Sequence, residues 1–413
     1  MNMMHRQVVV IGGGPAGLAA AAALHENGVR DILILEREPR LGGILNQCIH
    51  DGFGLTRFGE TMSGPEYAQR FADLVLEKKI EFVTNCTVIG VTPERVITAA
   101  SANGLLRISA DAVILTMGCR ERPRGALSTP GDRPAGVFTA GVAQSYINLK
   151  NTAVGKRVVI LGSGDIGMIM ARRLTLEGAK VEAVFELQPY PSGLPRNIEQ
   201  CLNDYGIPLF LSHTVTRITG RERLENVTVS QVDEKLKPIP GTEKVWPCDT
   251  LILSVGLIPE NELSLQAGVQ LDPRTRGAVV DEQYQTSTTG IFAAGNVLHV
   301  HDLVDFVSLE AENLAQAVCH YLDGGAVACE IPVETDGSVG YTVPQKISGK
   351  RDVTLSFRPR RPMKNVVFRV MQGERCLAEK KVRKALPAEM LHVSVSAEAF
   401  VSEEPVKVVC ENA

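Results

Sequence analysis

The sequence predicts an α/β fold with two Rossmann-like domains, one inserted in the other, followed by a small C-terminal all-β domain. A short apolar strand leads into a glycine-rich turn and a helix near residue 12, and the same succession returns near residue 162. After about residue 331 the chain changes to short β-type runs separated by Pro, Gly and charged turns. The predicted ranges are 1–122 and 251–328 for the first domain, 123–250 for the inserted domain and 331–413 for the tail.

The composition, 44% hydrophobic and 22% charged, is that of an ordinary globular protein. A formal net charge of −4 argues against a general nucleic-acid binder, which needs a basic face. We recognise no signal peptide and no uninterrupted apolar stretch of the ~18 residues that a spanning helix needs. Nine cysteines without a pattern favour a reducing compartment. We therefore expect a cytoplasmic protein without a transmembrane segment.

The first glycine-rich turn, residues 12–17 (GGGPAG), matches G-x-G-x-x-G between a strand and a helix, the context that gives the motif its meaning. Gly12 permits the tight turn, Gly14 lets the backbone approach a pyrophosphate, and Gly17 lets helix pack on strand. The helix N-terminus then offers N–H groups to that pyrophosphate. The next strand ends at Glu36, where an acid that binds ribose belongs. A coincidental glycine-rich turn is the alternative.

Four further segments carry a family resemblance. They are 37–43 (REPRLGG), 112–118 (AVILTMG), 251–259 (LILSVGLIP) and 289–296 (TGIFAAGN). Together with the first turn they resemble the two-dinucleotide flavoprotein reductases of the glutathione- and thioredoxin-reductase superfamily. The resemblance implies FAD at the first turn. Asn296 stands where that family has an acid that bonds the ribityl chain, and its amide oxygen can still accept this hydrogen bond.

Residues 162–167 (GSGDIG) repeat the turn between a strand and a helix, and the following strand ends at Glu186. An acid there would bond the adenosine 2′-hydroxyl and repel a 2′-phosphate, which favours NADH over NADPH. The alternative is ATP or ADP held as a fixed structural ligand. The predicted cofactor-binding residues of the two sites are Gly12, Gly14, Pro15, Ala16, Gly17, Glu36, Arg37, Gly42, Gly43, Val88, Thr116, Gly118, Gly162, Ser163, Gly164, Asp165, Ile166, Gly167, Glu186, Gly256, Gly295 and Asn296.

The cysteines form no C-x-x-C or C-x-x-x-x-C pair, which excludes disulfide reduction through an internal redox pair. Cys48 and His50, just after the Gly-Gly, are the candidate catalytic residues, as a thiol and a proton donor at the flavin. The alternative is a packed thiol and a surface or capping histidine.

We predict no metal site, because the remaining cysteines lack metal-ligand spacing. His299 and His301 would share one face of an extended segment, but no third ligand lies near them in sequence. They are interpreted as residues at the flavin edge or as ordinary polar loop residues. Helical spacing begins after them, from about residue 303.

Three segments narrow the resemblance, namely 43–54 (GILNQCIHDGFG), 64–70 (GPEYAQR) and 294–305 (AGNVLHVHDLVD). They resemble the flavoprotein subunit found beside anaerobic glycerol-3-phosphate dehydrogenase-type proteins. More distantly, the chain is similar to the FAD subunits of opine and proline dehydrogenases and of hydrogen cyanide synthase, which carry a cysteine-rich iron–sulfur module that this sequence does not contain.

This resemblance implies an FAD-dependent oxidoreductase that passes electrons between NAD(H) and a partner subunit. The expected partners are a small cysteine-bearing electron carrier and a second flavoprotein dehydrogenase subunit, in a hetero-oligomer. The alternative is a non-catalytic FAD- and ATP-binding scaffold subunit. For the tail we expect a small β-sandwich with basic residues on its surface, either a solvated face or a docking site for an acidic partner. These residues are Arg358, Arg360, Arg361, Lys364, Arg369, Arg375, Lys380, Lys381, Arg383 and Lys384.

Overall fold

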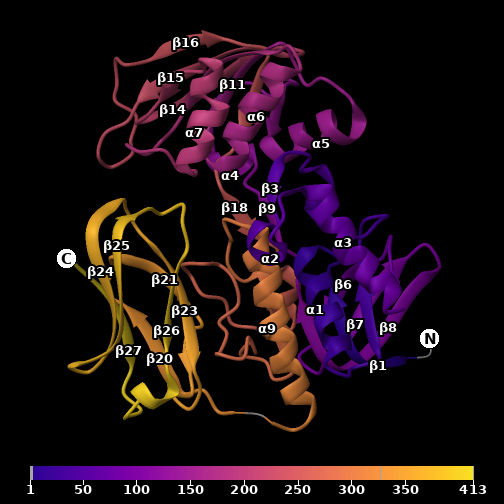
Figure 1. Ribbon diagram of the computed structural model, residues 1–413. Coiled ribbons are helices and arrows are strands. Elements are labelled where there is room, and N and C mark those ends of the chain that lie inside the picture. Colours follow the sequence, from indigo (N-terminus) through magenta and orange to yellow (C-terminus); the bar gives the residue numbers. More distant parts are fainter. Residues whose placement is uncertain (1–2, 326, 413) are drawn as a thin grey trace. The chain divides into compact units, whose positions relative to one another are not determined.

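The computed structural model describes residues 3–325 and 327–412 (Figure 1). The predicted domain ranges also include residues 1, 2, 326 and 413, which lie outside the described residues. The chain divides into two compact units, Met1–Cys119 with Pro259–Ala413, and Arg120–Ile258. The sheets confirm the predicted fold class, with two largely parallel sheets and a strand-rich C-terminal domain. Within the described residues, no helix combines the length and apolarity needed to cross a membrane.

The first sheet has the strand order β5-β2-β1-β8-β7-β6, and β19 pairs with β8. Its central strands are apolar on both faces, as expected where both faces are covered. The parallel strands are β1 (Met4–Ile11), β2 (Ile32–Leu35), β5 (Glu81–Val83), β8 (Gly104–Leu115) and β19 (Ile291–Ala293). The strands β6 (Thr87–Val91) and β7 (Val96–Ser101) form an antiparallel extension beside β8.

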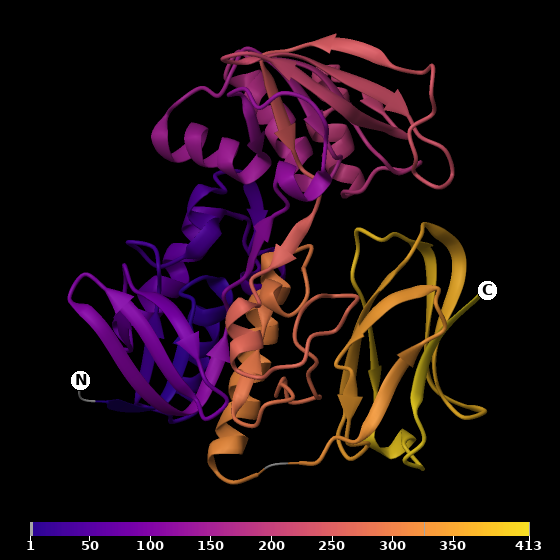
Figure 2. The ribbon, with the colours of Figure 1, turned by 180° about the vertical axis from the view of Figure 1, so that it is seen from behind.

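Three helices cover one face of this sheet: α1 (Pro15–Glu26), α3 (Gly64–Glu77) and α9 (Val304–Leu322). Helices α1 and α9 lie side by side although they are far apart in sequence (Figures 1 and 2). The predicted helix after residue 303 is therefore confirmed as α9. Between β2 and α3 the chain forms the short elements η1 (Gly43–Gln47), β3 (Asp51–Phe53), α2 (Leu55–Phe58) and β4 (Met62–Ser63).

The inserted unit has a parallel sheet of order β10-β17-β11-β12-β13 and an antiparallel sheet of order β14-β15-β16. Helices pack on one face of the parallel sheet and the antiparallel strands on the other. The helices are α5 (Ala140–Lys150), α6 (Asp165–Leu176) and α7 (Pro195–Cys201). The strands are β10 (Val137–Thr139), β11 (Arg157–Leu161), β12 (Lys180–Phe185), β13 (Leu209–Phe210), β14 (His213–Gly220), β15 (Leu224–Gln231), β16 (Lys244–Pro247) and β17 (Thr250–Leu253).

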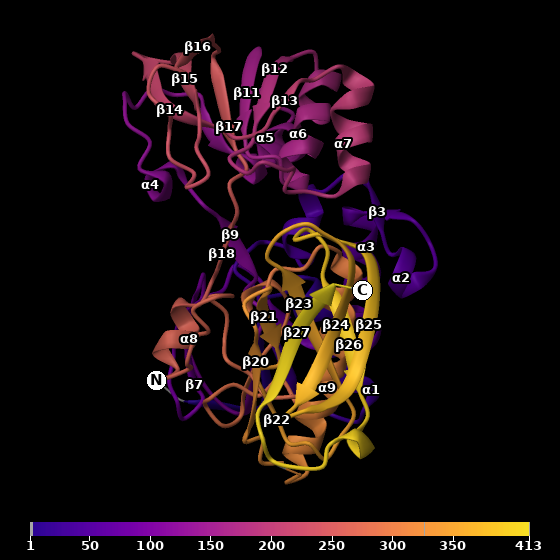
Figure 3. The ribbon, with the colours of Figure 1, turned by 90° about the vertical axis from the view of Figure 1, so that its left-hand side faces the viewer.

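The C-terminal domain is a sandwich of two sheets, of orders β22-β20-β27-β24-β25 and β21-β23-β26 (Figure 3). Buried and less buried residues alternate along β23, and the fully buried rings of Phe357 and Phe368 meet across the sheets at 5.2 Å between centroids. The strands are β20 (Ile331–Thr335), β21 (Val339–Val343), β22 (Lys346–Ile347), β23 (Val353–Pro359), β24 (Met363–Gln372), β25 (Arg375–Ala385), β26 (Leu391–Val395) and β27 (Val406–Asn412).

Arg358 fastens this domain to the loop that precedes α9. Its guanidinium donates hydrogen bonds to the carbonyl of Val300 (3.0 Å) and to Asp302 Oδ1 (3.2 Å), and also to the carbonyls of Pro387 and Ala388. The side chain is only 16% exposed. The prediction that Arg358 belongs to an exposed basic face is therefore wrong, because the loop covers that part of the strand.

We predict that Arg358→Met destabilises the protein by about 2 to 3 kcal/mol, since three carbonyls and a carboxylate lose their donor in a partly buried place. Arg360→Met, on the exposed side of the same strand end, is the matched control and should change the free energy of unfolding little. Chemical denaturation measures both. Equal losses in the two variants would contradict the role given to Arg358.

Candidate functional site

The first glycine-rich turn connects β1 to α1 with no room for side chains at two of its glycines. Gly12 has φ +109°, and a Cβ there would lie 2.5 Å from the carbonyl oxygen of Thr116. A Cβ on Gly17 would lie 1.9 Å from the carbonyl oxygen of Gly12. At Gly14, by contrast, the nearest atom is 4.0 Å away, so this glycine leaves open space at the start of α1. That space is where a pyrophosphate would approach the helix N-terminus.

Glu36 ties this turn to the end of β2. Its Oε2 accepts a hydrogen bond from the amide of Gly13 (2.6 Å) and its Oε1 from the amide of Glu38 (2.7 Å). The side chain is 5% exposed. A carboxylate has about four acceptor positions, so each oxygen keeps capacity for a ribose hydroxyl.

The Gly42–Gly43 pair passes directly over the turn. The amide of Gly42 donates to the carbonyl of Gly13 (2.8 Å), and a Cβ on Gly43 would lie 3.0 Å from the Cα of Gly14. Both glycines have positive φ, +106° and +56°, so larger residues would be strained as well as crowded. The backbone of this pair therefore lies close to Gly14, and a side chain at Gly43 would collide with it.

Two further segments reach the turn from far along the chain. Thr116, at the end of β8, donates its hydroxyl to the carbonyl of Ile11 (2.9 Å). Gly295 lies against α1, where an added Cβ would be 3.0 Å from the Cβ of Ala16. Next to it, Asn296 accepts a hydrogen bond at Oδ1 from the amide of His301 (3.0 Å). One lone pair of that oxygen remains for a ligand.

The other predicted residues of the first site lie at its margins. Pro15 is the first residue of α1, where its missing N–H costs nothing. Arg37 is exposed. Val88, in β6, packs against the far face of the sheet, and Gly118 has φ +71° with no atom within 4 Å of an added Cβ.

The second turn repeats the first between β11 and α6. A Cβ on Gly162 would lie 2.0 Å from the carbonyl oxygen of Ser254, and one on Gly167 would lie 2.7 Å from that of Gly162. Gly164 again has space, with its nearest atom, the hydroxyl oxygen of Ser254, at 3.6 Å. Ile166 packs against the core of this unit, and Gly256 has φ +98°.

Glu186 binds the second turn as Glu36 binds the first, but its carboxylate accepts more hydrogen bonds than that of Glu36. Its Oε2 accepts from the amide (3.0 Å) and the hydroxyl (2.6 Å) of Ser163 and from the hydroxyl of Ser192 (2.7 Å). Its Oε1 accepts from the amide of Gln188 (2.9 Å). A ribose hydroxyl at this site would meet Oε1 or displace one of the serine hydroxyls.

Gly193 lies against the second turn, although the sequence analysis did not single it out. An added Cβ there would lie 2.9 Å from the amide nitrogen of Asp165, the first residue of α6. The pairs Gly12 and Gly162, Glu36 and Glu186, and Gly43 and Gly193 are each separated by 150 positions (162 − 12, 186 − 36, 193 − 43). This constant offset is a signal in the sequence that identifies Gly193 as the counterpart of Gly43.

Asp165 distinguishes the second turn from the first, which has Pro15 at the same position. Its Oδ1 accepts hydrogen bonds from the amide of Leu194 (2.8 Å) and from Asn197 Nδ2 (2.6 Å). A carboxylate in the first turn of α6 is favoured by the helix dipole. It also fixes the loop that carries Gly193.

Cys48 and His50 follow η1. The Cys48 thiol packs against the apolar core and donates to the carbonyl of Ile44 (3.4 Å). Burial raises the pKa of Cys48 to about 12, so the group is a thiol at neutral pH. The His50 ring lies 5.0 Å from that of Phe53. This environment suits a packed thiol better than a nucleophile.

His299 and His301 lie together, with ring centroids 4.4 Å apart, as expected for residues on one face. The structure adds Glu310, from the second turn of α9, whose Oε2 lies 2.6 Å from His299 Nε2 and 3.4 Å from His301 Nε2. Burial is the main cause of a lowered pKa for His299. Burial alone would raise the pKa of Glu310, but the neighbouring imidazoles lower it overall.

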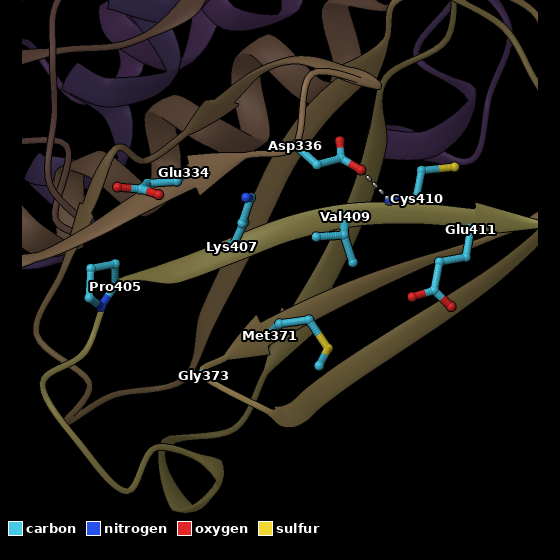
Figure 4. A pocket seen from close by; sticks show the side chains of 9 residues that line it. All are labelled: Glu334, Asp336, Met371, Gly373, Pro405, Lys407, Val409, Cys410 and Glu411. Carbon is cyan, nitrogen blue, oxygen red and sulfur yellow. Dashed lines mark hydrogen bonds between the residues drawn. The ribbon is translucent and has the colours of Figure 1, made fainter.

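A separate hollow lies in the C-terminal domain, on the sheet formed by β20, β24 and β27 (Figure 4). Three acids and one lysine line it, and Asp336 Oδ2 accepts a hydrogen bond from the amide of Cys410 (3.0 Å). None of its lining residues belongs to either glycine-rich turn. Its lining residues are Glu334, Asp336, Met371, Gly373, Pro405, Lys407, Val409, Cys410 and Glu411.

Comparison with known proteins assigns the region that contains both glycine-rich turns to one family. The model described as pyridine nucleotide-disulphide oxidoreductase matches residues 6–318. Hydrogen cyanide synthase subunit HcnB of Pseudomonas protegens is 28% identical, over 71% of this chain and 64% of its own length. An opine oxidase subunit of Agrobacterium tumefaciens is also 28% identical, over 70% and 60%. This chain thus spans less than two thirds of these two relatives.

A third relative is the ferredoxin–NAD(+) reductase subunit of the benzene 1,2-dioxygenase system of Pseudomonas putida, 30% identical over 71% of this chain and 67% of its own length. Among solved structures, thioredoxin reductase of T. acidophilum has a TM-score of 0.64 at 23% identity and covers 77% of this chain and 98% of its own. L-proline dehydrogenase of P. horikoshii has a TM-score of 0.56 at 20% identity, with coverages of 79% and 58%. These two structures support the fold alone.

We predict that Gly14→Val abolishes FAD retention while the protein stays folded. The added Cβ meets no atom nearer than 4.0 Å, so the side chain enters the open space in front of α1 and not the protein core. Absorbance of the purified protein and thermal unfolding measure the two effects. Gly90→Val, on strand β6 of the same domain, is the control and should keep its flavin. Full flavin content in Gly14→Val would refute the site.

We predict that Cys48 is alkylated by iodoacetamide much more slowly than the exposed Cys376. Alkylation requires the thiolate, and a pKa of about 12 leaves Cys48 protonated from neutral pH to about pH 10. Its rate should therefore stay low across that range. Peptide mass spectrometry after timed labelling measures both residues. Equal rates at the two cysteines would make Cys48 a reactive thiol.

Proposed function

Because this chain belongs to the pyridine nucleotide-disulphide oxidoreductase family, we propose that it is an FAD-dependent oxidoreductase that transfers electrons between NAD(H) and a partner subunit of a dehydrogenase complex. FAD is assigned to the first turn and NAD(H) to the second. The observation that carries the proposal is the repeated construction of the two turns, each with an open central glycine above a buried glutamate.

The residues of the first turn fit a dinucleotide. Gly14 leaves the N-terminus of α1 accessible, so its unpaired N–H groups and partial positive charge can face a pyrophosphate. Glu36 retains acceptor positions for the ribose of the adenosine half. Asn296 retains an oxygen lone pair for a ribityl hydroxyl. Bound FAD would supply a group that accepts hydride and releases electrons singly, and the protein's part is to bind and orient it.

Glu186 supports NADH as the partner nucleotide. Its carboxylate is 4% exposed and lies at the end of β12, where the adenosine ribose of a nucleotide on the second turn would lie. A 2′-phosphate there would face a like charge, which costs several kcal/mol. The serine hydroxyls on Glu186 give a second acceptor or donor to the same ribose.

The electrons must leave the flavin by a route other than a cysteine pair within the chain. All nine cysteines lie within the described residues, and none of them forms a disulfide there. Three of the relatives above are named as subunits, which supports a partner protein as the outlet. We propose a small cysteine-bearing carrier and a second flavoprotein dehydrogenase subunit, as in the assemblies of anaerobic glycerol-3-phosphate dehydrogenase type that segments 43–54 and 294–305 resemble.

We predict that NADH reduces the bound flavin anaerobically and that NADPH does so at least ~100-fold less efficiently, the ratio that a few kcal/mol produces. Stopped-flow absorbance of the purified protein with each nucleotide measures both. Comparable efficiency with NADPH would contradict the role of Glu186. Reduction by neither nucleotide would contradict the oxidoreductase assignment and favour a scaffold subunit with ATP or ADP on the second turn.

We predict that the isolated chain is a poor dehydrogenase for small hydroxy acids and gains activity with its partner subunits. The physical reason is that the described residues include no disulfide that could accept electrons from the reduced flavin. Turnover with an artificial acceptor, compared with and without co-expressed partners, measures this. Rapid substrate oxidation by the isolated chain would contradict the partner requirement.

A further inference from the structure

The imidazoles of His299 and His301 and the Oε2 atom of Glu310 have no assigned part in either nucleotide site, although the cluster contacts Gly295 and Asn296 through hydrogen bonds. One ligand-capable atom of each residue lies within 4.8 Å of the others. The three side chains are 1%, 3% and 9% exposed. Two imidazoles and a carboxylate thus converge in the interior of the first unit, between the loop after Gly295 and the helix α9.

The partners of the buried Glu310 carboxylate are one backbone amide and two imidazoles. Its Oε1 accepts a hydrogen bond from the amide of Gly295 (2.7 Å), and its Oε2 faces both imidazoles. No Lys or Arg forms an ion pair with it among the described residues, and the nearby Arg358 is engaged by Asp302. Buried charges in proteins are paired or coordinate metals, and a cation between these three side chains would meet that requirement.

The histidine nitrogens are also free to act as ligands. Nδ1 of His299 and Nδ1 of His301 are buried without a hydrogen-bond partner in the described protein. Nδ1 of each ring can therefore carry the ring proton, so that Nε2 offers its lone pair to a cation. The Gly295 amide orients the carboxylate, as outer contacts orient ligands in metal sites.

We propose that His299, His301 and Glu310 bind a divalent transition-metal ion, with Zn²⁺ as the ion that this ligand set suits best. Imidazole nitrogen and carboxylate oxygen bind Zn²⁺ at about 2.0 to 2.2 Å, which separates ligands in a tetrahedral site by about 3.3 Å. The His301–Glu310 separation of 3.4 Å meets this value, and the His299–Glu310 separation of 2.6 Å must open. Three protein ligands leave a fourth position for water.

The role of such an ion would be structural and electrostatic. It would join the loop of residues 299–301 to α9, close to the peptide that places Asn296. It would also add two positive charges to the buried carboxylate and imidazoles, next to Asn296. The inference goes beyond the proposed function and does not depend on it, because zinc binding is measured without any turnover.

The test is zinc content of tag-free, FAD-containing protein after incubation with Zn²⁺ and gel filtration. We expect one zinc per chain. His301→Ala and Glu310→Gln should each weaken binding by more than ~10-fold, because losing a ligand costs more than losing an outer contact. Glu310→Gln keeps an oxygen for the Gly295 amide, and its flavin content and circular dichroism report the fold. His213→Ala, in the inserted unit, is the control and should keep the zinc.

X-ray absorption at the zinc edge of the unaltered protein gives an answer that needs no variant. Nitrogen and oxygen ligands near ~2.0 Å with imidazole scattering are expected, whereas sulfur at about 2.3 Å would show zinc on cysteines. Zinc well below one per chain in the unaltered protein would overturn the proposal. Unchanged zinc in folded Glu310→Gln and His301→Ala would overturn it too, as would sulfur ligation.

Discussion

In each Rossmann-like sheet a buried glutamate holds the glycine-rich turn to the end of the second strand. Glu36 accepts the amide of Gly13, and Glu186 accepts the amide of Ser163. A carboxylate taken from water is costly unless it is hydrogen-bonded, so these amides compensate the burial of both acids. The same bonds fix the turn, and the turn sets the direction of the helix N-terminus.

The two sites diverge in the residues that surround this common construction. The first has Pro15 and the Gly42–Gly43 pair, which carry no charge. The second has Asp165 and Gly193 in the equivalent positions, and its glutamate is surrounded by serine hydroxyls. A cofactor that stays bound and a nucleotide that binds and leaves have different requirements. The fuller bonding of Glu186 suits the second, since a ribose hydroxyl that binds at Oε2 exchanges with a serine hydroxyl already present.

The sequence alone was sufficient to predict the two glycine-rich turns. The strand, the glycines and the acid of each turn lie within about 30 consecutive residues, where local spacing decides the geometry. It also predicted α9 from helical spacing. The sequence did not predict that Glu310 lies beside His299, because only the tertiary packing of α9 brings the two side chains together. Arg358 was misjudged for a related reason: alternation along a strand predicts which face a residue takes, but not that a loop from another domain covers it. The position of Gly193 could have been predicted from the sequence, because corresponding residues of the two turns are separated by a constant 150 positions.

We propose that two turns of the same construction hold two different nucleotides, with electrons passing between them. The most direct test is anaerobic reduction of the Gly164→Val variant, in which the new side chain enters open space at the second turn alone. We expect a protein with full FAD content whose flavin is reduced by dithionite and not by NADH. Reduction by NADH at the rate of the unaltered protein, or loss of FAD from the variant, would contradict the proposal.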